Sequence, residues 1–107
     1  MTKKIAAICL LGLMLYQGVA MAGAVTKDGY YNGIRLAGKV KVVTSFPDIK
    51  VKVVDAFPDL KVKHVNAFPT DVGKWQFVTS GEDFTIQYVD AFPDIKIKFV
   101  DALPGVP

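Results

Sequence analysis

The sequence is dominated by a tandem repeat of eleven residues. Aligned from Lys39, six successive units read KVKVVTSFPDI, KVKVVDAFPDL, KVKHVNAFPTD, KWQFVTSGEDF, TIQYVDAFPDI and KIKFVDALPGV, and the two residues VG are inserted before the fourth unit. With this insertion the repeat spans residues 39–106. Such a period predicts that each unit forms one structural element and that neighbouring units bury each other's apolar faces.

Each unit has the pattern of one β-strand followed by a corner. From Ile49 to Val53, β-branched residues alternate with Lys50 and Lys52, as in a strand buried on one face. A repeat of odd length would reverse the buried face at every pass, so the connection must correct it. The segment Asp-Ala-Phe-Pro-Asp suits a corner, because Pro fixes a backbone angle and Asp accepts a hydrogen bond from the backbone two residues on. We expect strands of about six residues.

Two sets of apolar residues do not fit a sheet that is wet on one face. A Val precedes every corner and a Phe lies within most of them: Val43, Val54, Val65, Val78, Val89 and Val100, and Phe46, Phe57, Phe68 and Phe92. We therefore predict a single all-β domain of six to eight short strands whose sheet curls, forms a second layer or winds its strands about each other, with the Phe rings as a plug between layers. A compact β-solenoid is the alternative, although a coil of eleven residues at ~3.3 Å each encloses little interior.

The start of the chain has the features of a secretory signal peptide. Lys3 and Lys4 precede an apolar stretch at residues 5–16, and small residues lead up to a predicted cleavage site after Ala22. Residues 1–22 are thus predicted to be removed, which places the protein in the periplasm or outside the cell without a membrane span. An uncleaved anchor is the alternative, but it needs about 20 apolar residues.

The mature chain is expected to have a short leader, residues 23–38, and a repeat domain, residues 39–107. The leader contains the turn signals Asp28-Gly29 and Asn32-Gly33, and Asn-Gly favours a hairpin. We expect it to be mobile at Gly23 and to add one or two short strands to the repeat sheet.

Signal cleavage changes the composition that bears on function. The only cysteine, Cys9, and all three methionines lie in residues 1–22, so the mature chain contains no sulfur and excludes disulfides and thiolate chemistry. Two of the 13 Lys and Arg residues also leave, and the remaining 11 face 10 acidic residues. This near-neutral balance does not favour nucleic acid or an anionic membrane as an obligatory partner.

The fourth unit departs from the repeat. It has Gly81 and Glu82 in place of Phe-Pro, and Trp75 where other units have Val or Ile. Large aromatic residues usually belong to a core, so Trp75 and Phe77 are expected to fill enlarged space where the chain reverses. The alternative is a rim of Trp75, Glu82 and Tyr88 that stacks on a sugar or a peptide.

The charged rows have structural and functional interpretations. The lysines could bind an anionic polymer, but lysines on the open side of a strand more often confer solubility and block edge pairing. The aspartates could bind Ca²⁺, but an Asp beside Pro is more often a turn acceptor. These rows are Lys39, Lys50, Lys61, Lys96, Lys41, Lys52, Lys63 and Lys98, and Asp55, Asp90, Asp101, Asp48, Asp59, Asp83 and Asp94. His64, the only histidine, is expected to be a buried or edge residue rather than a metal ligand.

Few residues suggest catalysis. Ser45 and Ser80 are equivalent corner residues without a recurring histidine, Glu82 is the only Glu, and there is no glycine-rich phosphate loop. We predict no catalytic residues, no cofactor and no metal site.

The stretches VKVVDAFPDLKVK and IQYVDAFPDIKIKFVDALPG resemble a family of small secreted bacterial proteins built from strand-Phe-Pro-Asp repeats, and the resemblance covers residues 39–106. It implies a compact β-repeat protein of undefined activity, with no catalytic residues to carry over. Such proteins are often labelled 6-phosphogluconate dehydrogenase, which would imply an oxidoreductase. That enzyme is several times longer and begins with a strand, a glycine-rich turn and a helix, which this sequence lacks.

Together these features predict an exported, non-enzymatic protein of the cell envelope that resists proteolysis and oxidation and has a structural or partner-binding role. The first alternative is a module that binds a glycan or peptide through the irregular fourth unit. The second is the oxidoreductase that the family label implies.

Overall fold

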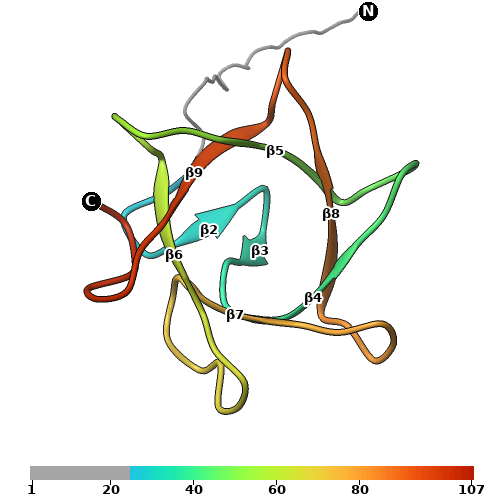
Figure 1. The fold of residues 1–107 in the computed structure, drawn as a ribbon, viewed down its shortest axis with the longest axis horizontal. Helices are drawn as coiled ribbons and strands as arrows, with labels where there is room; N and C mark the ends of the chain where they lie inside the picture. Colours follow the sequence, from blue (N-terminus) through green and yellow to red (C-terminus); the bar gives the residue numbers. More distant parts are fainter. Residues whose placement is uncertain (1–24) are drawn as a thin grey trace, which may run out of the picture.

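The computed structural model describes residues 25–107, and the predicted signal peptide lies outside them (Figure 1). The described part of the chain contains eight short strands and no helix, which confirms the all-β prediction. The strands are β2 (Tyr30–Tyr31), β3 (Ile34–Arg35), β4 (Gly38–Val42), β5 (Ile49–Val53), β6 (Leu60–His64), β7 (Lys74–Phe77), β8 (Phe84–Tyr88) and β9 (Ile95–Phe99). The repeat strands have four or five residues rather than the expected six.

The six repeat strands form one closed parallel barrel in the order β4-β7-β6-β9-β5-β8. Successive strands along the chain lie two places apart in this ring, except β6 and β7, which are neighbours. The first three repeat strands therefore take alternate places, and the last three fill the gaps between them. The closed, interwound form of the predicted sheet is confirmed, and the solenoid alternative is wrong.

Each corner that skips a place passes over the strand in between. After β5, the Val54 N–H donates to the carbonyl oxygen of Ile97, and the Asp59 N–H donates to that of Lys96, both at 2.8 Å. Val54 and Asp59 thus flank β9, and the corner between them projects outward from the barrel (Figure 1). The equivalent bonds carry residues 44–47 over β8, 79–82 over β4, 90–93 over β5 and 101–104 over β6.

The inserted Val72-Gly73 lies in the connection between β6 and β7. This connection joins neighbouring strands and crosses none. It begins like the standard corner, with the Val65 N–H donating to the carbonyl oxygen of Trp75 and a positive φ at Phe68, and it differs after Phe68, where the Thr70 N–H donates to the Phe68 carbonyl oxygen. Gly73 has a φ of 91°, and a Cβ there would lie 2.5 Å from the backbone of both Gly105 and Lys61. The insertion therefore marks the point where the chain moves from the first set of strand places to the second.

The barrel interior is filled by the alternating residues that the sequence pattern predicts. The buried core residues of the repeat strands are Val40, Ile49, Val51, Leu60, Val62, Trp75, Phe84, Ile86, Ile95 and Ile97. The end where the strands begin is covered by the β2–β3 hairpin, and Leu36 is fully buried there (Figure 1). Asn32 and Gly33 have φ values of 50° and 83°, so the predicted Asn-Gly turn forms. The hairpin is a separate two-stranded sheet, contrary to expectation, because a closed barrel has no free edge to extend.

The expectation that the corner Phe rings plug a space between layers is wrong. Phe46, Phe57, Phe68 and Phe92 are 83–97% exposed. The barrel has no second layer, its interior is filled by the alternating core residues, and the corners lie outside its wall. The Val residues before the corners are half-buried and donate their N–H groups to neighbouring strands.

Candidate functional site

The barrel is open at the end where its strands finish. The last inward residues of the six strands meet at this end because all the strands are parallel; they are Val42, Val53, His64, Phe77, Tyr88 and Phe99, which we call the mouth. Val42, Val53, Tyr88 and Phe99 are each between 41% and 47% exposed. The mouth is thus where the apolar interior reaches solvent, whereas the hairpin covers the opposite end.

A cleft of about 520 Å³ lies at the mouth beside the ends of β6, β7 and β9. It is lined by Lys63, His64, Phe77, Phe99, Val100 and Asp101. The ring of Phe77 lies 5.3 Å from that of His64 in an edge-to-face arrangement and 6.4 Å from that of Phe99, measured between centroids. These spacings are typical of paired aromatic rings. The cleft, called the first cleft below, is therefore lined by three aromatic rings together with the amine of Lys63 and the carboxylate of Asp101.

A second cleft of about 450 Å³ occupies the equivalent place beside β5 and β8. It is lined by Lys52, Val53, Tyr88, Val89 and Asp90, which are repeat equivalents of residues in the first cleft. Burial raises the pKa of the Tyr88 phenol above its usual value. The second cleft has one aromatic ring where the first has two and a histidine.

The corners are the second unusual surface. The same repeat position has a positive φ in every unit, with values of 51–56° at Phe46, Phe57, Phe68, Phe92 and Leu103 and 75° at Gly81. A bulky residue in this left-handed conformation is strained, and a following Pro restricts it further. Glycine has no such strain, so only the Gly81 corner has the residue that the backbone favours.

The corner aspartates fasten the barrel. The Lys50 N–H donates to Asp94 Oδ2, and the Lys96 N–H donates to Asp59 Oδ2, both at 2.8 Å. The sequence predicted bonds to the backbone two residues on, but these bonds reach the strand that each corner crosses, 44 or 37 residues away. Asp83 and Asp48 make the equivalent bonds to Lys39 and Thr85. Within residues 25–107, no group of three or more metal-ligating side chains could hold an ion.

The structure does not bring the candidate ligand residues together. Trp75 is fully buried, and its indole N–H donates to the carbonyl oxygen of Leu36 at 3.1 Å, so a ligand has no indole surface on which to stack. Glu82 lies exposed before the start of β8, and Tyr88 ends that strand. Tyr88 belongs to the mouth, together with His64 and Phe99, which the sequence interpretation did not include. One feature of the sequence could have identified these residues. The last inward residue of each repeat strand is Val in the first two units but His, Phe or Tyr in the last four.

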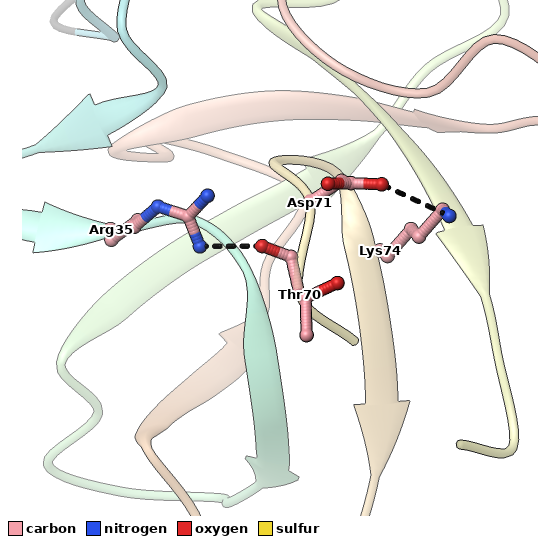
Figure 2. Close-up of polar contacts among 4 residues, drawn as sticks. All are labelled: Arg35, Thr70, Asp71 and Lys74. Carbon is pink, nitrogen blue, oxygen red and sulfur yellow. Dashed lines mark hydrogen bonds and ion pairs between the residues drawn. The ribbon is translucent and has the colours of Figure 1, made fainter. Parts of the chain in front are cut away.

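The lysines line the outer wall of the barrel. Lys63 is paired with Lys74 across neighbouring strands, and Lys52 is paired with Lys96. A closed barrel has no edge to protect, so blocking of edge pairing does not explain these residues. The ion pair found within the described residues joins Lys74 to Asp71 at 3.2 Å (Figure 2).

Figure 2 also shows how the hairpin is fastened to the barrel. The Arg35 guanidinium on β3 donates to the carbonyl oxygen of Thr70 at 2.8 Å, in the connection that precedes β7. Burial, followed by the nearby Asp94 carboxylate, raises the pKa of Tyr31 on β2. The closed end is thus held by polar contacts as well as by packing.

No helix in residues 25–107 is long and apolar enough to cross a membrane.

Comparison with known proteins identifies the repeat domain. No curated protein matched the chain. A family model described as the 7(1) septoil knot domain matches residues 33–107, a description that fits the interwound strand order. Since this match spans more than half of the chain, the protein belongs to the septoil knot domain family.

Proposed function

We propose that this protein is an exported, non-enzymatic binding protein of the cell envelope and that the mouth is its ligand-binding surface. The observation that carries the proposal is the aromatic first cleft, formed by Phe77, Phe99 and His64 at the open end of an otherwise closed barrel. Apolar clefts with a few polar groups are the usual form of ligand sites. The predicted signal peptide at residues 1–22 supports export to the periplasm or beyond.

The ligand is a glycan or a peptide. Paired aromatic rings offer a flat apolar surface to the C–H face of a sugar or to an apolar side chain. Lys63 and Asp101 supply a donor and an acceptor in the same cleft. This site takes the place of the rim around Trp75 that the sequence suggested.

One feature supports a non-enzymatic role against the oxidoreductase alternative. The dinucleotide site of a dehydrogenase needs a glycine-rich turn that leads into a helix, and residues 25–107 contain no helix. The oxidoreductase alternative therefore gains no support.

The architecture suits a protein that works outside the cytoplasm. The interwound barrel has no free strand edge, and its strands are fastened across large sequence separations. With the sulfur atoms confined to the predicted signal peptide, the mature chain has no Cys or Met side chain to oxidise. Resistance to proteases and oxidants is the expected consequence.

Ligand binding can be tested through Trp75, whose ring lies 6.3 Å from that of Phe77 in the mouth, measured between centroids. Purified residues 23–107 are titrated with envelope oligosaccharides and short aromatic peptides while indole fluorescence is recorded. We expect Phe99→Ala to weaken binding at least about tenfold, a loss of about 1.4 kcal/mol of binding free energy. The matched control is Phe92→Ala, an exposed ring outside the mouth. Binding that survives Phe99→Ala would move the site away from the mouth.

Export is tested separately on the full chain. The protein is expressed with its own N-terminus, and the mass of the product in each cell fraction is measured. We expect a product that begins at Gly23 in the periplasmic or extracellular fraction. A product retaining Met1 in the cytoplasm or the membrane would contradict the proposed location.

A further inference from the structure

The first cleft holds two opposite charges that do not pair with each other. Lys63 lies near the end of β6, and Asp101 opens the corner that follows β9. Both residues line the cleft, yet the ion pair found within residues 25–107 joins Lys74 to Asp71, so Lys63 and Asp101 form none. An ammonium and a carboxylate in the same cleft are therefore both available to a ligand.

The corner does not require the acidic side chain of Asp101. The aspartates that fasten the barrel, such as Asp94, close their corners, whereas Asp101 opens one. Thr44 and Thr79 occupy the equivalent place after β4 and β7. Because those corners cross their strands without an acid at this place, the carboxylate of Asp101 is free to serve the cleft.

Charge complementarity narrows the chemistry of the ligand. A cation and an anion in one cleft complement a molecule that itself carries both an anionic and a cationic group. Hydrogen bonds between ionised groups are stronger than those between neutral groups, so a neutral glycan would use these side chains less well. A polymer of one charge sign would meet a like charge at Lys63 or Asp101.

The remainder of the cleft favours a small ligand with an apolar group. The rings of Phe77 and Phe99 lie 6.4 Å apart between centroids and both line the cleft. Aromatic rings at this spacing offer a surface on which a third ring packs. The volume of about 520 Å³ lies within the usual range for small-molecule sites.

We propose that the first cleft binds a zwitterion with an apolar side chain, which is the chemistry of an α-amino acid or of a short peptide with both ends free. The ligand carboxylate accepts from the Lys63 ammonium, and the ligand ammonium donates to the Asp101 carboxylate. The apolar side chain packs on the rings of Phe77 and Phe99. This inference rests on the proposed function of the mouth as a binding surface, and it names the class of ligand.

The first experiment compares four forms of one peptide. Residues 23–107 are titrated by calorimetry at about pH 7, where both peptide ends are ionised. The probes are alanyl-phenylalanyl-alanine with free ends, with an acetylated N-terminus, with an amidated C-terminus and with both blocks. We expect each single block to weaken binding at least about tenfold, which corresponds to 1.4 kcal/mol of binding free energy. A doubly blocked peptide that binds as tightly as the free one would overturn the proposal.

The source of the zwitterion is identified by length. Phenylalanine and alanyl-phenylalanine are titrated in the same way as the tripeptide. All three carry an ammonium, a carboxylate and a ring, but the separation of the two charges differs. The compound that binds most tightly shows whether the cleft takes a free amino acid or a peptide. Equal binding of a neutral oligosaccharide would overturn the zwitterion.

The second experiment assigns each end of the peptide to one side chain. Lys63→Met removes the charge and keeps an apolar stem, and it relieves the like-charge pairing with Lys74 across neighbouring strands. In this variant, amidation of the peptide should no longer weaken binding, whereas acetylation still should. Asp101→Asn should show the reverse. A purely structural role would weaken all four forms alike, and that result would overturn the proposed contacts.

The second cleft supplies the matched controls. Lys52 and Asp90 line it as repeat equivalents of Lys63 and Asp101, but Tyr88 is its one aromatic ring. Lys52→Met and Asp90→Asn therefore make the same changes of charge away from the paired rings. Both controls should keep the affinity and the ranking of the four peptide forms. A loss in Lys52→Met equal to that in Lys63→Met would overturn the assignment to the first cleft.

The outcomes also separate this inference from the function on which it rests. If blocked peptides or oligosaccharides bind in a Phe99-dependent way and free ends add nothing, the mouth remains a binding surface and only the zwitterion is rejected. If none of these compounds binds in a Phe99-dependent way, both proposals fail.

Discussion

Trp75 and Phe57 are both large aromatic residues, yet they occupy opposite environments. Trp75 has no exposed surface, whereas Phe57 is 93% exposed. The difference is one of repeat position, because inward strand positions face the closed barrel and corner positions lie outside its wall. Hydrophobicity alone therefore does not decide burial in this chain, and an apolar ring that recurs outside the wall requires a different explanation from one inside it.

The largest test of this comparison removes each ring in turn. Trp75→Ala should lower the free energy of unfolding by about 3–5 kcal/mol, because it leaves a cavity in the core. It also leaves the carbonyl oxygen of Leu36 without its indole donor. Phe57→Ala should change stability by less than about 0.5 kcal/mol. Denaturant unfolding of both variants measures the difference, and equal losses would show that Phe57 packs within its own chain.

Removing a hydrogen bond between a corner aspartate and the strand that it crosses should have the next largest effect on stability. Asp94→Ala removes the acceptor of the Lys50 N–H together with the carboxylate beside Tyr31, and it should lower the free energy of unfolding by about 1–2 kcal/mol. Asp94→Asn keeps an acceptor oxygen and should recover most of this loss. Asp90→Ala, an exposed residue in the same corner, is the control and should change stability by less than about 0.5 kcal/mol. A loss as large in Asp90→Ala would mean that corner charge, rather than the hydrogen bond, is stabilising.

A smaller effect distinguishes the strain of the corner backbone from any stability that the corner ring contributes. Gly81→Ala should cost about 1 kcal/mol of stability from left-handed strain alone, since an added Cβ meets open space. Phe57→Gly should leave the protein unchanged or up to about 1 kcal/mol more stable, because relief of strain is partly offset by the freer unfolded chain. Thermal unfolding compares the two. A clear loss of stability in Phe57→Gly would contradict the view that the ring is dispensable for folding.

The smallest effect concerns Tyr88, which lies at the boundary between the interior and solvent. Its raised pKa means that the folded state holds the phenolic proton more tightly than the unfolded state. Stability is then fully present below the usual pKa of 10.0 and falls as the pH rises through the higher folded value. Tyr88→Phe should lose less stability than the parent chain between about pH 8 and pH 11. Identical pH profiles would place the phenol fully in solvent.

Much of the local structure was predictable from particular residues. The alternation at Ile49–Val53 identified a strand and its buried face, and Asn32-Gly33 identified the hairpin turn. The corner aspartates were recognised as backbone acceptors, although their partners lie on the crossed strand. These features depend on neighbouring residues and on backbone preferences, both of which a single sequence displays.

The arrangement in space was less predictable. Nearly identical units are compatible with several strand orders, so the repeat alone did not show that β9 lies between β5 and β6. Because the strand order was open, we expected a second layer of sheet to cover the corner rings, but the barrel has no such layer and the rings are exposed. The open strand order also concealed the mouth, which exists only because six parallel strands end together.

The sequence by itself determined the repeat, its strands and corners, the inward residues and the sulfur-free composition of the predicted mature chain, because these follow from periodicity and residue chemistry. Only the tertiary structure decided that the chain passes over its own strands and that the corner rings face solvent, and it confirmed the expected core position of Trp75. The physical reason is closure of the barrel. It pairs residues 37 and 44 positions apart and leaves the corner rings outside the barrel wall.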